Sequence, residues 1–319
     1  MINYLFESLP MKYSAFIGVM VAFLLTCFLL KKFGDKLPKD VGRDFALNGK
    51  LSAGKPRGAG FIFIMVFAFA AVMFGKVSLE IVIYIVLTIF AMMTGFLDDC
   101  AKTPWGRVKK GILDLIIAIL VAVTFLHYNS SSVLIAVTGT VIKLNPIVFA
   151  ILTIILVWAS INVTNCADGV DGLSGTLTII TLTSIYLYDS IKEVSPEMGL
   201  IILIFIVCIL GYLWYNATPS KMLMGDAGSR AMGLFISVAI LKTGSPFLYI
   251  PFAIVLILDG GLGLVKITLL KCKIKALTKV RTPLHDHVRK NWDWSNTQAV
   301  FRFAIIQIIV SLATIYLTL

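Results

Sequence analysis

The sequence predicts an all-α integral membrane protein, because its composition is too apolar for a soluble domain and its apolar residues gather in runs of membrane-spanning length. Of its 319 residues, 59% are hydrophobic and 14% are charged, whereas soluble domains average about 45–50% apolar and about 25% charged residues. A helix of about 20 apolar residues crosses a bilayer, and it satisfies its own backbone polar groups in lipid. We therefore expect a single polytopic membrane domain over residues 1–319.

We expect about ten transmembrane helices and one small β-hairpin. The apolar runs occupy residues 13–30, 58–75, 79–96, 111–126, 145–163, 173–188, 198–215, 227–242, 247–268 and 298–318. Residues 128–144 are instead β-branched and turn-rich, which predicts a short hairpin at the membrane surface. The first run lacks a preceding basic region and a clear cleavage site, so we interpret it as a retained span.

The basic residues orient these helices. Most Lys and Arg residues fall in the loops after odd-numbered runs, and the opposite side carries only Lys12, Lys76, Lys143, Lys192 and Lys242. Because Lys and Arg accumulate in cytoplasmic loops, we expect the odd-numbered loops inside, with both termini and the hairpin outside. The net charge of +11 therefore reflects membrane topology, and we expect no nucleic-acid partner. The five cysteines form no CxxC pair, so neither a disulfide framework nor a zinc site is indicated.

Four polar segments fall on the expected cytoplasmic face. They are GFLDDCAK with Asp98 and Asp99, NVTNCADGVDGLSG with Asp168 and Asp171, KMLMGDAGSR with Asp226, and RTPLHDHVRKNW with His285, Asp286 and His287. Carboxylates gathered together stay ionised only when a cation lies among them, and oxygen ligands suit Mg²⁺ or Mn²⁺ better than zinc. The segments therefore predict metal-assisted transfer involving a phosphorylated cytosolic substrate, at a lipid boundary where a membrane-borne second substrate can enter.

Taken singly, each segment also has a purely structural explanation. The Asp98-Asp99 pair could mark the membrane interface, the Asn, Asp and Gly residues of 162–173 could form a turn, and Asp226 could cap a helix. The HDH sequence could be solvated surface, and Asp259 could pack against another helix. Four such segments on one predicted face nevertheless favour a functional site.

Longer motifs carry a resemblance to a known family. They are GFLDD (95–99), NVTNCADGVDGL (162–173), NATPSKMLMGDAGS (216–229), PLHDH with WSNTQAVFRF (283–303), and a looser KPRGAG (55–60). With these motifs the sequence resembles the polyprenyl-phosphate N-acetylhexosamine-1-phosphate transferase superfamily, and within it the bacterial phospho-N-acetylmuramoyl-pentapeptide transferase branch. The likeness extends over about residues 31–319.

The resemblance implies a homodimeric ten-helix enzyme of the bacterial inner membrane with its active site on the cytoplasmic side. In that family an undecaprenyl phosphate oxygen attacks the β-phosphate of UDP-MurNAc-pentapeptide. UMP leaves, and the lipid-linked diphosphate sugar is the first lipid intermediate of peptidoglycan synthesis. The implied cofactor is Mg²⁺, with Mn²⁺ as the alternative. Our hypothesis is direct attack by the lipid phosphate rather than a covalent intermediate on an aspartate.

The resemblance also implies roles for individual residues. Asp226 is the expected Mg²⁺ ligand together with Asp99, Asp98 is the candidate general base, and His285 matches the first histidine of the family's triplet. Further substrate-binding positions are matched by Lys102, Asn162, Asn165, Asp168, Gly169, Val170, Asp171, Asn216, Leu223 and His287.

Three departures from the family pattern leave the sugar donor open. Asp286 replaces the middle histidine of the triplet, Leu223 stands where an aromatic residue normally stacks on uracil, and Lys55 and Arg57 replace small or polar residues. The alternative donor is UDP-GlcNAc or another UDP-HexNAc used for a different cell-envelope polymer.

Two other classes of protein fit less well. A cation-coupled transporter predicts acidic residues near mid-membrane, and only Asp259 and Asp114 come close. An inactive, lipid-binding relative would not need the intact acidic residues and His285.

Overall fold

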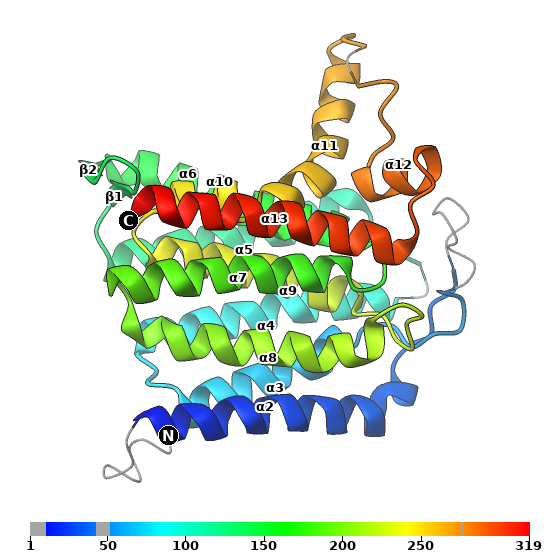
Figure 1. The fold of residues 1–319 in the computed structure, drawn as a ribbon, viewed down its shortest axis with the longest axis horizontal. Coiled ribbons are helices and arrows are strands. Elements are labelled where there is room, and N and C mark those ends of the chain that lie inside the picture. The colour runs from blue at the N-terminus through cyan, green and yellow to red at the C-terminus, as the bar shows by residue number, and fades with distance from the viewer. Residues whose placement is uncertain (1–10, 43–51, 102, 276) are drawn as a thin grey trace.

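The structure is a computed structural model that describes residues 11–42, 52–101, 103–275 and 277–319. Most of its helices run side by side in one bundle (Figure 1). The helices are α2 (Met11–Phe33), α3 (Gly60–Phe74), α4 (Leu79–Asp99), α5 (Arg107–Tyr128), α6 (Pro146–Cys166), α7 (Leu173–Lys192), α8 (Pro196–Asn216), α9 (Gly225–Lys242), α10 (Tyr249–Phe252), α11 (Ile254–Lys271), α12 (Leu284–Asn291) and α13 (Asn296–Thr318), with short 3₁₀ helices η1 (Gly34–Lys36) and η3 (Pro246–Leu248). All the apolar runs that the sequence predicts as spans are mainly helical, although one of them is broken.

The predicted hairpin is confirmed. Strands β1 (Ser132–Ile135) and β2 (Thr140–Lys143) pair antiparallel. The backbone N–H of Leu134 donates to the Gly244 carbonyl at 2.8 Å, which attaches the hairpin to the turn after α9. The hairpin lies at the same end of the bundle as the start of α2 and the end of α13 (Figure 1). We call this the hairpin end and the opposite end of the bundle the site end.

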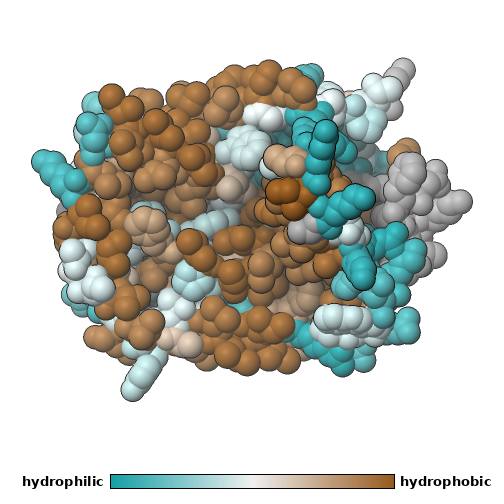
Figure 2. Space-filling model, turned by 90° about the horizontal axis from the view of Figure 1, so that it is seen from above, coloured by the Kyte–Doolittle hydropathy of each residue, from teal (hydrophilic) through white to brown (hydrophobic). Residues whose placement is uncertain are grey.

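The protein is a multi-pass membrane protein by the length and composition of its helices. Among the described residues, α2, α4, α5, α6, α8 and α13 are long and apolar enough to cross a membrane, and α10 with α11 makes a seventh if the two form one span. In Figure 2 apolar residues cover most of the visible face, and hydrophilic residues gather toward the site end. The count of ten spans and the orientation of the termini remain predictions.

Helix α9 does not need an apolar surface because it lies at the centre of the bundle. Every residue from Gly225 to Leu241 is buried, and the helix packs mainly against α4 and α6, with further contacts to α3 and α7. Neighbouring helices rather than lipid therefore surround its charged residues. Arg230 pairs with Asp114 of α5, and Lys242 pairs with Glu80 of α4 at 2.9 Å at the hairpin end.

Two glycines allow α9 to approach its neighbours closely. A Cβ on Gly95 of α4 would lie 2.3 Å from the Asp226 carbonyl group, and a Cβ on Gly60 of α3 would lie 2.0 Å from the Gly228 nitrogen. Side chains at either position would push the helices apart. These contacts bring the end of α4 and the start of α9 together at the site end.

The ninth predicted span is not one straight helix, and the sequence-based interpretation was wrong on this point. Helices α10 and α11 meet at 88°, and α11 leaves the bundle (Figure 1). Gln307 of α13 compensates for the break. Its amide donates to the carbonyls of Pro251 at 3.0 Å and Phe252 at 2.9 Å, and its carbonyl accepts from Val255 N–H at 2.9 Å. Because unsatisfied backbone groups are costly in lipid, this side chain makes the bend possible.

We expect Gln307→Leu to destabilise the protein by about 2 kcal/mol or more, because the Val255 N–H and the Pro251 carbonyl lose their partner and each costs about 1–3 kcal/mol when unsatisfied. The Phe252 carbonyl keeps the hydrogen bond from Thr181 Oγ1 at 2.7 Å. Unfolding titrations with denaturing detergent measure this loss. Gln298→Leu, which alters only the exposed capping box at the start of α13, is the matched control and should cost less. Equal stability of the Gln307 variant and the wild type would contradict this account of the bend.

Candidate active site

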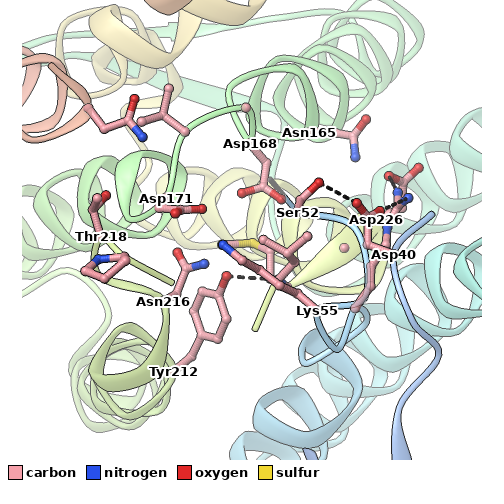
Figure 3. Close-up of a pocket in the computed structure, with 18 of the residues that line it drawn as sticks. Asp40, Ser52, Lys55, Asn165, Asp168, Asp171, Tyr212, Asn216, Thr218 and Asp226 are labelled. Atoms are coloured by element: carbon pink, nitrogen blue, oxygen red, sulfur yellow. Dashed lines mark hydrogen bonds and ion pairs between the residues drawn. The ribbon is translucent and has the colours of Figure 1, made fainter. Parts of the chain in front are cut away.

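A cavity of about 440 Å³ opens at the site end. Figure 3 shows that its walls come from segments far apart in the sequence, with Asp168 and Asp171 after α6, Tyr212 and Asn216 at the end of α8, and Asp226 at the start of α9. Three of the four polar segments that the sequence singled out therefore contribute to the lining of one cavity. The basic segment before α3 completes it.

Three carboxylates form a cluster beside this cavity. One oxygen from each of Asp98, Asp99 and Asp226 lies within 4.8 Å of the others. Gly225 makes this approach possible, since its φ of 69° is in the left-handed region and a Cβ there would lie 2.1 Å from Asp99 Oδ2. Asp99 also accepts a hydrogen bond from the N–H of Ala227 at 3.3 Å. The Asp99 side chain at the end of α4 thus packs directly against the backbone at the start of α9.

Two cations neutralise part of this negative charge. Lys110 Nζ lies 2.5 Å from Asp98 Oδ2 and 2.9 Å from Asp226 Oδ2. Arg57 Nε lies 2.9 Å from Asp99 Oδ1. Asp98 and Asp99 need such partners because the C-terminal end of a helix carries partial negative charge. Asp226 is in the first turn of α9, where the helix itself favours an anion.

The cluster fits a divalent cation such as Mg²⁺. All its side-chain donors are oxygens, which suit Mg²⁺ and Mn²⁺. Asp99 Oδ1 is buried and accepts no well-formed hydrogen bond from the described residues, although Arg57 is close. With every group ionised, the three carboxylates and Asp40 exceed Lys110 and Arg57 by two negative charges. One divalent ion would balance them.

The loop after α6 forms one wall of the cavity. Asp168, Gly169, Val170 and Asp171 all line it. Asn216 supports the loop, since its side-chain oxygen accepts from Gly172 N–H at 2.8 Å and its amide donates to the Met222 carbonyl at 2.8 Å.

Leu223 also lines the cavity. Its backbone pairs with the segment before α3, donating to the Pro56 carbonyl at 2.8 Å and accepting from Ala59 N–H at 3.0 Å. This pairing connects the loop before α9 to the segment that carries Arg57.

His285 lies behind the cavity wall rather than in it. Its side chain is buried, and a Cβ on Gly169 would lie 2.2 Å from Nε2, so only glycine fits against the ring. The carboxylate of Asp259 in α11 holds His285 in place. Its Oδ1 accepts a hydrogen bond from the His285 backbone N–H at 2.7 Å, and its Oδ2 lies 2.8 Å from the ring nitrogen Nδ1. Because the bend after α10 sets the direction of α11, it also places Asp259 under His285.

The remaining predicted residues divide into two groups. Asn165 lines the cavity and donates to Ser229 Oγ at 2.9 Å. The side-chain amide of Asn162 instead donates to Asp114 Oδ2 at 3.3 Å. The ring nitrogen Nδ1 of His287 accepts from the backbone N–H of Arg281 at 3.2 Å. Neither is among the described residues that line the cavity. Lys102 lies outside the described residues, and the substrate-binding roles of all these residues remain predictions.

Sequence reasoning missed several contributors to the site. Asp40 is buried at the cavity and binds Arg57 Nη1 at 3.3 Å and Ser52 Oγ at 2.6 Å. Arg289 also lines the cavity and pairs with Asp286 at 2.6 Å. Asp40 stands among basic loop residues with no motif around it, so nothing in the sequence distinguished it. Arg57 was visible only as a departure from the family pattern.

Comparisons with known proteins agree with the motifs. The family model described as glycosyl transferase family 4 matches residues 81–244. A phospho-N-acetylmuramoyl-pentapeptide-transferase of Treponema pallidum (strain Nichols) is 37% identical over 310 residues, which covers 91% of this chain and 85% of the relative. The chain belongs to glycosyl transferase family 4. The predicted resemblance is thereby confirmed, and the protein is a phosphoglycosyl transferase.

Other members of glycosyl transferase family 4 carry the same name at lower identity. The relative from Wolbachia pipientis wMel is 28% identical, with 82% of this chain and 83% of the relative covered. The relative from Helicobacter pylori (strain J99) is 25% identical, with 95% and 93% covered. The similarity therefore extends over most of the chain.

We expect Asp259→Asn to lower kcat by about tenfold or more, since a hydrogen bond to a charged group contributes about 1.5–3 kcal/mol. The amide of asparagine offers one acceptor for the two His285 groups that Asp259 now binds. A transferase assay with separate determination of kcat and KM measures the effect, and thermal unfolding checks that the fold is kept. A normally folded variant with wild-type kcat would rule out a positioning role for Asp259.

Proposed function

We propose that the protein transfers phospho-N-acetylmuramoyl-pentapeptide from UDP-MurNAc-pentapeptide to undecaprenyl phosphate, with Mg²⁺ as cofactor. The products are UMP and the first lipid intermediate of peptidoglycan synthesis. One observation carries the proposal: Asp98 and Asp99 come together with Asp226, which lines a cavity that the loop from Asp168 to Asp171 also lines. The names of the relatives support the same reaction.

In this proposal the carboxylate cluster would hold Mg²⁺, chiefly through Asp226 and Asp99. The bound ion would neutralise the diphosphate of the donor, which is the main requirement of phosphoryl-type transfer. Lys55, Arg57 and Arg289 add positive charge to the lining of the cavity. Binding and charge neutralisation, rather than covalent chemistry by the protein, would then carry most of the catalysis.

Asp98 is the candidate base in the same scheme. Its Oδ1 accepts from the N–H of Trp105 at 2.6 Å, and Lys110 holds its Oδ2, so the carboxylate is kept in one orientation. It would take the proton from the lipid phosphate. The freed phosphate oxygen then bonds to the β-phosphorus as the bond from that phosphorus to the UMP oxygen breaks.

The location of the reaction follows from the charges of the loops. We propose that the site end faces the cytoplasm of a bacterial cell and that the bundle lies in the inner membrane, because basic loop residues accumulate on the cytoplasmic side. Undecaprenyl phosphate would then reach the cluster from the inner leaflet and the nucleotide sugar from the cytosol. A homodimer is the oligomeric state we expect from the resemblance.

The sugar donor can be tested directly. Purified protein is incubated with undecaprenyl phosphate and either UDP-MurNAc-pentapeptide or UDP-GlcNAc, and released UMP is measured. We expect turnover with the muramoyl pentapeptide donor. Turnover with UDP-GlcNAc alone would replace the proposed substrate by the alternative, to which the added cations Lys55 and Arg57 in the cavity lining point.

We expect Asp226→Ala to reduce UMP release by about 10²–10³-fold or more, since loss of one electrostatic contact to a transition state has effects of that size. Asp226 also pairs with both cations of the cluster, so its removal unbalances the whole site. Asp35→Asn is the matched control, because this carboxylate is almost fully exposed, and its activity should equal that of the wild type. Substantial UMP release by the Asp226 variant would remove the metal assignment.

A further inference from the structure

Arg57 contacts three carboxylates at once. Its Nε lies 2.9 Å from Asp99 Oδ1, its Nη1 lies 3.3 Å from Asp40 Oδ1, and its Nη2 lies 3.5 Å from Asp226 Oδ1. Two of these partners, Asp99 and Asp226, belong to the proposed metal site. The third, Asp40, lies outside the three-carboxylate cluster. The guanidinium is therefore shared between the metal ligands and a separate anchor.

The backbone around Arg57 is fixed on both sides. Its N–H donates to the Pro38 carbonyl at 2.8 Å, and the preceding carbonyl, of Pro56, accepts from Leu223 N–H at 2.8 Å. The Arg57 side chain is 18% exposed and lines the cavity. The backbone of Arg57 is thus held at the edge of the cluster.

The anchor is itself held in place. Asp40 Oδ2 accepts from Ser52 Oγ at 2.6 Å and from Gly42 N–H at 3.2 Å, and Figure 3 shows Asp40 and Ser52 next to Asp226 on one side of the cavity. Asp40 can therefore retain the guanidinium when Asp99 and Asp226 bind another cation. Lys110, the other cation of the cluster, pairs only with Asp98 and Asp226 among the described residues and is not among those lining the cavity.

The positive charge of Arg57 competes with other cations for the carboxylates of Asp99 and Asp226. Burial by itself lowers the pKa of the Arg57 guanidinium, but the attraction of Asp99, Asp226 and Asp40 outweighs it and leaves the pKa above its ordinary value. Arg57 is therefore charged at every physiological pH. A cation this close to a carboxylate typically weakens its affinity for a proton by roughly 10–1,000-fold, and a divalent ion on the same oxygens meets the same repulsion.

We propose that Arg57 is a built-in competitor for the metal site, which pairs Asp99 and Asp226 in the metal-free protein and lowers the affinity of the cluster for Mg²⁺. When the metal displaces it, Asp40 keeps the guanidinium at the cavity, where the diphosphate of the donor would lie. This inference rests on the proposed metal-dependent function. It assigns a role to a residue that the sequence showed only as a departure from the family pattern.

Binding of Mn²⁺ to the purified full-length protein, without nucleotide or lipid, tests the proposal. The electron paramagnetic resonance signal of free Mn²⁺ gives the Kd. We expect Arg57→Gln to bind Mn²⁺ about tenfold more tightly, at the low end of the effect of one adjacent charge, and Arg57→Lys to stay closer to the wild type. Arg57→Thr provides a second neutral variant if Arg57→Gln does not fold. Unchanged or weaker Mn²⁺ binding by a folded neutral variant would overturn the proposal.

Two controls separate this effect from general changes in charge. Lys55→Gln removes a positive charge from the same segment, but Lys55 Nζ donates to Ser220 Oγ at 3.0 Å rather than to the cluster, so its Kd should change less than that of Arg57→Gln. Asp226→Ala, alone and combined with Arg57→Gln, should abolish the binding. If neither the wild type nor Arg57→Gln binds Mn²⁺, the metal-dependent function fails as well, whereas binding without tightening overturns only the role of Arg57.

Discussion

The close approach of α4 and α9 at the site end is the constraint on which the rest of the structure depends. It places the carboxylates of Asp98, Asp99 and Asp226 within 4.8 Å of one another. Like charges at such distances are stable only with cations among them. The surrounding segments therefore have to supply Lys110 and Arg57, and with Asp40 counted beside the cluster two negative charges still remain for a divalent ion to balance.

The bundle is arranged around this requirement. Because other helices enclose α9, it can begin with a carboxylate and carry Arg230 without exposing either to lipid. Glycine at 95 and 225 removes the side chains that would separate the two acidic segments. The polar character of α9 is therefore a consequence of its central position, and that position is what brings the site together.

A second line of support extends from the bend after α10 to the cavity wall. Gln307 satisfies the backbone at the break, α11 then carries Asp259 to His285, and the histidine ring packs against Gly169. The loop from Asp168 to Asp171, which lines the cavity, is thus held from behind by a buried polar contact. The bend between α10 and α11 therefore helps to determine the shape of the cavity, although the bend itself lies outside the cavity.

The sequence alone determined the class of the protein and predicted a site on one face of it. Runs of apolar residues predicted the helices, since lipid imposes a length and a composition that can be counted, and the motifs with Asp98, Asp99, Asp168, Asp171 and Asp226 pointed to the residues around the cavity. The tertiary structure alone decided which of them meet. It separated Asn162 and His287 from the cavity, placed His285 behind Gly169, and recruited Asp40, Arg57 and Asp259. These outcomes depend on distances between helices that are far apart along the chain, and residue order does not encode such distances locally.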